Sequence, residues 1–281
     1  MTHIIRWVLV ALVLLGLPFV LGSGGCSGGA LFTVDEPTEI SLGKEAITEV
    51  EKQTPVISGT RDAERVERIG KQLAALTDRP KLPWSFKVVD SKEINAFALP
   101  GGPVYVTKGL LDLKIPDAEL AAVLGHEATH INQRHSAKAI EKAMTIALIT
   151  NLALRNQSDI TSAAVNLALT YGITMPHSRA NEYEADAMGV RLSYNAGYPA
   201  DSMALFLKRL DEVVGASQTA EWMSDHPNTQ ARVQRTLRIA EEVAAQPRPV
   251  PYTLSQYDKD IIKHLPAADT TKPADNAPTT K

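Results

Sequence analysis

Apolar residues along the chain recur mainly at helical spacing. Between Glu39 and Leu76 they fall three or four positions apart, on both sides of a break at residues 55–59, which predicts two helices. The same spacing returns after residue 107, with Asp117 and Asp201 as candidate caps. Further helices are expected over residues 108–113, 118–142, 179–195, from 202 past Leu210, and from after Pro227 to about 245, with an apolar helical hairpin over 143–171.

Extended patterns are confined to one region between these helices. Residues 84–89 alternate in polarity and predict a strand, and residues 94–99 and 104–106 flank a Pro-Gly-Gly-Pro turn at 100–103, which predicts a hairpin. The expected fold class is therefore α+β and mainly α-helical, with a small sheet or hairpin. An edge strand there could bind an extended peptide through backbone hydrogen bonds, which makes Asn95, Ala96 and Phe97 candidate substrate-binding residues.

The first 25 residues have the pattern of a secretory signal. Arg6 precedes an uncharged apolar run over residues 7–21, which is shorter than the roughly 20 residues that cross a bilayer. Cys26, the single cysteine of the chain, follows this run, where a lipid-modified cysteine would stand. Ser23 departs from the leucine usual in such a signal, so an incidental thiol after an ordinary signal or an uncleaved anchor stays as the alternative. Ser27 gives no inner-membrane retention signal, which favours the outer membrane.

The remaining boundaries follow from composition. Residues 26–38 are expected to be a flexible tether, rich in glycine and serine at their start. Residues 39–246 would form the folded domain, and residues 247–281 a proline-rich linker with a disordered tail. The 281 residues are 44% hydrophobic with a formal net charge of −3. No basic field or phosphate-binding loop is present, so nucleic acid is not an expected partner.

The stretch His126-Glu127-Ala128-Thr129-His130 carries the strongest chemical signal. On a helix, a spacing of four leaves His126 and His130 on one face, about 40° apart, so that both imidazoles can bind one zinc ion. Glu127 is rotated by about 100° from His126, within reach of a water molecule that such an ion would activate. The pattern therefore predicts a hydrolytic zinc site with Glu127 as the general base.

A third protein ligand must come from elsewhere in the chain. If the helix continues, His135 lies about 180° from His126 and faces away. Glu182 and Asp186 are four apart and share a helical face, so one could bind zinc while the other accepts a hydrogen bond from a ligating histidine. Glu184 would point elsewhere, as a solvated charge.

The stretches HEATH, SRANEYEADAMG and DHPNTQAR, in this order, resemble peptidase family M48, the Ste24-, HtpX- and Oma1-like zinc endopeptidases of the gluzincin type. NAFALPGGPVYVTKGLL is similar to the edge-strand hairpin of the family. The resemblance implies one zinc ion per chain on His126, His130 and Glu182, with Asp186 supporting a ligand. It further implies that His226 and Arg232 sit over the site as catalytic residues, where they stabilise the oxyanion or regulate access to zinc. His177 stands where an aromatic is more usual and is a further candidate metal contact.

The expected function is a membrane-tethered zinc endopeptidase of the bacterial periplasm that cleaves unfolded or misassembled envelope polypeptides, anchored by a lipid on Cys26. A second hypothesis is a chaperone-like assembly factor whose zinc site is silent or regulatory. A third is hydrolysis of a non-peptide amide, such as one in cell-wall material.

Overall fold

The computed structural model describes residues 33–154, 177–215, 226 and 230–264. Its sheet has four strands in the order β1-β2-β4-β3. β2 and β4 are parallel, whereas β1 on β2 and β3 on β4 are antiparallel. The strands are β1 (Val56–Ile57), β2 (Ser85–Val89), β3 (Ala96–Ala98) and β4 (Pro103–Thr107).

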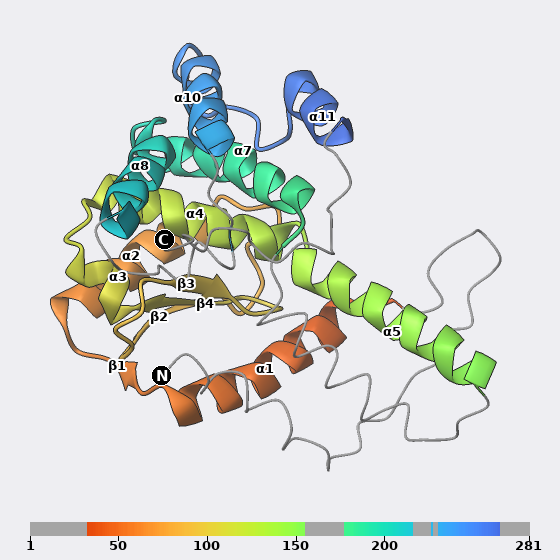
Figure 1. The fold of residues 1–281 in the computed structure, drawn as a ribbon. Coiled ribbons are helices and arrows are strands. Elements are labelled where there is room, and N and C mark those ends of the chain that lie inside the picture. The colour runs from red at the N-terminus through yellow and green to blue at the C-terminus, as the bar shows by residue number, and fades with distance from the viewer. Residues whose placement is uncertain (1–32, 155–176, 216–225, 227–229, 265–281) are drawn as a thin grey trace, which may run out of the picture.

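Helices cover both faces of this sheet (Figure 1). Phe86, Val88, Val104 and Val106 face the main core, shared with α2 and α4, whereas Val89 and Tyr105 face a smaller core against α1. This alternation is the period of two expected of strands covered on both faces. The helices are α1 (Glu36–Gln53), α2 (Arg61–Ala74), α3 (Lys108–Asp112), α4 (Asp117–Asn132), α5 (His135–Leu154), α7 (Arg179–Asn195), α8 (Ser202–Gly215), α10 (Gln230–Ala244) and α11 (Gln256–Lys263).

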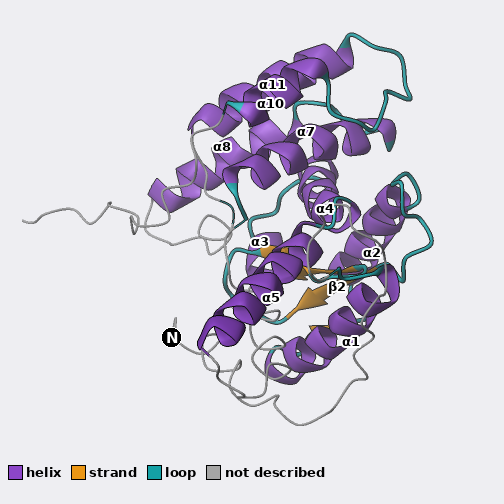
Figure 2. Ribbon diagram, turned by 90° about the vertical axis from the view of Figure 1, so that its right-hand side faces the viewer, coloured by secondary structure: helices purple, strands orange, loops and turns teal. Residues whose placement is uncertain are grey.

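The expected α+β, mainly helical architecture is confirmed, and the hairpin falls where the turn predicted it. α7 lies over α4 on the side away from the sheet, α8 packs on α4 beside it, and α10 and α11 lie beyond α7 (Figures 1 and 2). β3 is one edge of the sheet and packs against α4. The layers thus place α4, which carries both histidines of the sequence motif, between the sheet and α7.

Several boundaries differ from the sequence predictions. α1 begins at Glu36, within the predicted tether, because the Asp35 side chain caps it by accepting from Thr38 N at 3.0 Å. Asp117 is the first residue of α4 and no cap, because its carboxylate accepts from Arg65 and Arg68 on α2. The predicted helix over residues 118–142 is two helices. β1 and α11 were not predicted at all.

The predicted signal, Cys26 and the second half of the apolar hairpin lie outside the described residues. Among the helices that the structure describes, none combines the length and the apolar character that a bilayer crossing requires.

Candidate metal centre

Two glycines allow α4 and α7 to cross in backbone contact. A Cβ atom on Gly189 would lie 2.9 Å from the backbone nitrogen of His126, and one on Gly125 would lie 3.0 Å from the Gly189 carbonyl oxygen. Any larger residue would force the helices apart, because real Cβ atoms do not approach backbone this closely. The close crossing brings side chains from the first two turns of α7 beside the motif histidines of α4.

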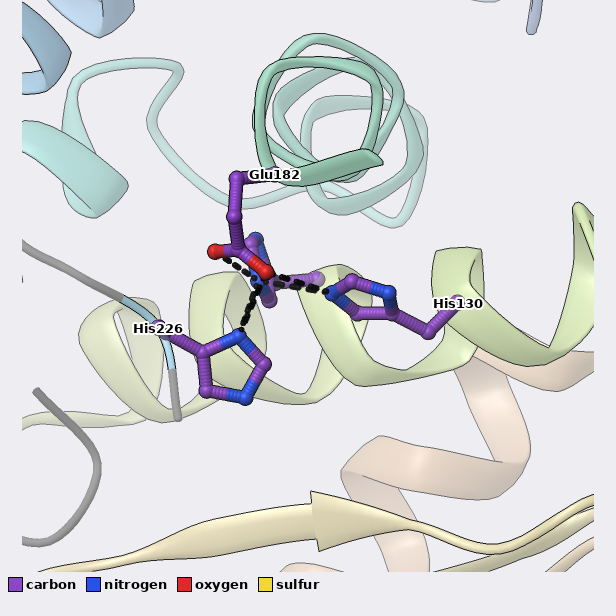
Figure 3. Close-up of side chains that lie close together, drawn as sticks. His130, Glu182 and His226 are labelled. Atoms are coloured by element: carbon purple, nitrogen blue, oxygen red, sulfur yellow. Dashed lines mark hydrogen bonds and ion pairs between the residues drawn. The ribbon is translucent and has the colours of Figure 1, made fainter. Parts of the chain in front are cut away.

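Four side chains direct ligand atoms at a common point (Figure 3). His126 Nε2 and His130 Nε2 are 3.1 Å apart, and the two oxygens of Glu182 lie 3.5 Å from these atoms. His226 Nδ1 lies 2.9 Å from a Glu182 oxygen and 3.2 Å from His126 Nε2. All four residues are at most 3% exposed. His126, His130 and Glu182, predicted as ligands, are therefore brought together with His226.

Asp186 and Arg232 lie behind the ligands. An oxygen of Asp186 is 3.1 Å from His126 Nδ1, so this carboxylate holds the ring nitrogen that faces away from the common point. Arg232 donates to both oxygens of Asp186 at 2.7 and 2.9 Å, and lies 3.1 Å from Glu182. The prediction for Asp186 as a supporting residue agrees with this placement. Arg232 is predicted to sit over the site, but it is buried and contacts the carboxylates of Asp186 and Glu182 instead.

The pKa values reflect crowded negative charge. Burial acts to lower the pKa of His126, but its contacts with Asp186 and Glu182 raise it to about 9. Burial raises the pKa of Asp186, yet Arg232 and His126 bring it down to about 2. Burial and the neighbouring imidazoles lower the pKa of His130 well below its ordinary value, which keeps this ring neutral.

These residues fit a divalent cation. The centre contains three carboxylates, Glu127, Glu182 and Asp186, against one guanidinium, Arg232. The acids thus exceed the guanidinium by two in a buried space, and this excess is balanced in part by a proton on His126, whose pKa it raises, or by a metal ion that takes the place of that proton. The separations of 2.9–3.5 Å between ligand atoms are those of atoms sharing one small ion. Imidazole and carboxylate together are a donor set that zinc accepts.

Glu127 follows His126 in α4 and is buried, with an oxygen 3.5 Å from His226 Nε2. The carboxylate therefore lies beside the ligand cluster, as the rotation of one residue along the helix predicted.

Of the predicted substrate-binding residues, Ala96 and Phe97 lie on β3 and Asn95 directly precedes it. Asn95 and Leu99 bond to β4, with Thr107 N donating to the Asn95 carbonyl at 3.0 Å and Leu99 N donating to Pro103 at 2.8 Å. Because alternate residues of an antiparallel strand bond to the same neighbour, the backbone groups of Ala96 and Ala98 face the outer edge. The Phe97 ring stacks on Tyr105, within the sheet.

The prediction that His135 faces away is wrong. α4 ends at Asn132, and Arg134 adopts a left-handed conformation with φ of 59°, so the chain turns before α5 begins at His135. His135 is 2% exposed and its Nδ1 lies 2.8 Å from Nδ1 of His130. Glu184, predicted as a solvated charge, lies with an oxygen 3.3 Å from His135 Nε2. His177 stacks on His130 with ring centroids 3.9 Å apart. Among the described residues, it is not one of the four that direct ligand atoms at the common point.

A helical pair of ligands on α4, a carboxylate from α7 and an adjacent acid beside a small sheet define a metallopeptidase of the gluzincin arrangement. The chain belongs to peptidase family M48, whose model matches residues 60–240.

Curated relatives agree with this membership. The chain is 28% identical over 243 residues to the beta-barrel assembly-enhancing protease of Yersinia pestis, covering 83% of this chain and 49% of that protein. It is 31% identical over 226 residues to the putative beta-barrel assembly-enhancing protease of Vibrio cholerae, covering 77% and 46%. It is 32% identical over 171 residues to the mitochondrial metalloendopeptidase OMA1 of Schizosaccharomyces pombe, covering 60% and 50%. The chain thus spans about half the length of these relatives.

Proposed function

We propose that this protein is a zinc endopeptidase of the bacterial envelope that cleaves unfolded or misassembled polypeptides. The observation that carries the proposal is the convergence of His126, His130 and Glu182, with 3.1–3.5 Å between their ligand atoms, beside the carboxylate of Glu127. The names of the bacterial relatives support the envelope and a role in quality control.

The residues divide the work of peptide hydrolysis among them. His126, His130 and Glu182 would hold one zinc ion, which when bound polarises the scissile carbonyl and activates water. Glu127 accepts the proton of the attacking water and returns it to the leaving amine. His226 also directs its Nδ1 at the point where the ion would lie, so it would yield that position to water and substrate during catalysis and donate to the negative charge that develops on the carbonyl oxygen. Arg232 acts through Asp186 and Glu182, which it holds ionised and oriented.

The substrate would add to the sheet as an extended strand. β3 is an edge strand that packs against α4, and the backbone groups of Ala96 and Ala98 face its outer edge. Backbone pairing of this kind accepts many sequences but only unfolded or flexible segments, which matches a protease that removes misassembled proteins. A lipid on Cys26 would hold the protease at a membrane, with the outer membrane favoured by Ser27.

The test compares Glu127→Gln with the unmodified full chain on casein. We expect cleavage to fall by about 100-fold or more, because the glutamine cannot take the proton, while bound zinc stays at one ion per chain. Glu64→Gln, an exposed change on α2, is the matched control and should cleave normally.

Two results would redirect the proposal. Envelope function that survives Glu127→Gln would favour the chaperone-like alternative, in which binding rather than hydrolysis matters. Release of fragments from muropeptides but not from casein would favour the non-peptide amide.

A further inference from the structure

Beside the metal centre lies a second group of three histidines, His130, His135 and His177, whose ring nitrogens also lie close together. His130 belongs to both groups, with its Nε2 in the metal centre and its Nδ1 toward His135. This shared ring decides what the second group can do.

A neutral imidazole carries one proton. If His130 binds the metal through Nε2, its proton must be on Nδ1, and that nitrogen has no lone pair left for a second cation. Its neighbour at 2.8 Å is Nδ1 of His135, which must therefore be the acceptor. The three histidines consequently cannot form a second metal site while the first is filled.

The same reasoning fixes the proton of His135. Since its Nδ1 accepts, its proton is on Nε2, which lies 3.3 Å from an oxygen of Glu184. Glu184, whose pKa is lowered by this contact, is ionised at neutral pH and accepts a hydrogen bond from the Nε2–H group. The hydrogen bonds thus run in one direction, from His130 through His135 to Glu184.

We propose that His135 and Glu184 are the positioning pair of His130, which fix its tautomer and orient its Nε2 toward the metal. The pair is the counterpart of Asp186, which lies 3.1 Å from Nδ1 of His126 and supports the other histidine directly. His177 stacks on one face of the His130 ring at 3.9 Å, and the burial of both His130 and His135 keeps the hydrogen bond between them away from water. Partners of this kind contribute roughly 10–100-fold to metal affinity.

The inference rests on the proposed function only in its use of zinc, so its test measures metal binding rather than cleavage. The full chain carrying Glu127→Gln, which prevents self-cleavage, is titrated with zinc against a chromophoric chelator. His135→Phe keeps a ring but offers no acceptor, whereas His135→Asn is smaller but places an amide oxygen near the former Nδ1.

We expect one zinc per chain, an affinity 10–100-fold lower for His135→Phe, and an affinity within about fivefold of the parent for His135→Asn. A role in packing alone predicts the opposite order, because phenylalanine fills the buried space better than asparagine. Three results would overturn the positioning pair. The first is an unchanged affinity for His135→Phe, and the second is an affinity that is lower for His135→Asn than for His135→Phe. The third is the binding of two zinc ions per chain.

Nitrogen-15 spectra of the zinc-loaded, otherwise unmodified chain test the same point without a variant at residue 135. We expect a proton on Nδ1 of His130 and on Nε2 of His135, and a proton on Nδ1 of His135 overturns the proposal. A parent chain that takes up no zinc overturns the proposed function as well. If the unmodified chain takes up zinc and cleaves casein, and His135→Phe binds zinc with full affinity, the positioning pair is overturned while the proposed function stands.

Discussion

α7 and α10 carry two buried clusters of charge that differ in their balance. In the metal centre, Glu182 and Asp186 of α7 meet Arg232 of α10, with Glu127 nearby, so acids outnumber the guanidinium. Further along both helices, Arg191 and Arg235 meet the fully buried Asp258 of α11, and Glu242 completes the group.

The second cluster contains two guanidinium groups and two carboxylates, so it neutralises itself. The first has more acids than guanidinium groups and directs imidazole and carboxylate atoms at one point, where a bound metal ion would balance the excess negative charge. Burial of charge therefore does not by itself mark a functional site; the excess of acceptors does. The comparison assigns the first cluster to metal binding and the second to stability.

The largest expected effect separates the two roles. Glu182→Gln should weaken zinc binding on the order of 10³-fold, because a structural zinc site contributes about 10–16 kcal/mol shared among its ligands. The melting temperature of the chelator-treated protein should stay close to that of the unmodified chain. Zinc titration and calorimetry measure the two quantities, and a variant that binds zinc normally would remove Glu182 from the ligand set.

Asp258→Ala should show the reverse. It leaves Arg191 and Arg235 without the buried carboxylate that lies 2.9 and 3.3 Å from them, and removes the capping box of α11. Loss of one partner from a buried ion pair costs about 3–5 kcal/mol. Urea unfolding should record this loss, while zinc affinity of the folded protein changes less than about threefold. A large loss of zinc affinity with little change in unfolding would contradict the division of roles.

Glu242→Gln is the smallest change and the control for Asp258→Ala. Glu242 is the half-exposed partner of Arg191. Its carboxylate oxygen lies 3.2 Å from the guanidinium, and 36% of its side chain is accessible to solvent. Exposed ion pairs contribute about 0–1 kcal/mol, so the free energy of unfolding measured in urea should fall by less than about 1 kcal/mol. A cost near that of Asp258→Ala would show that the second cluster acts as one cooperative network.

The sequence carries strong information on the metal centre because its spacing is local. His126 and His130 share a face whatever surrounds them, and the Pro-Gly-Gly-Pro turn defines its hairpin. Spacing alone left Glu182 and Asp186 as alternatives. Their positions separate them, since Glu182 faces both Nε2 atoms and Asp186 faces Nδ1 of His126.

What the sequence did not reveal depends on tertiary contacts. His135 appeared to face away only because the helix was assumed to continue, whereas Arg134 turns the chain and pairs with Glu39 of α1. The cluster around Asp258 joins residues 23 and 67 positions apart, with no motif among them. α11 itself carries a local signal that the sequence analysis missed, the capping box of Ser255 and Asp258, but no local pattern indicates its contacts with Arg191 and Arg235.

The crossing of Gly125 and Gly189 has a consequence for how the protein takes up its ion. Since the two helices touch through their main chains, the backbone at residues 126, 130 and 182 is positioned by helix packing rather than by coordination. Little conformational entropy is then lost on capture, and the free energy of coordination goes into affinity rather than into assembling the site.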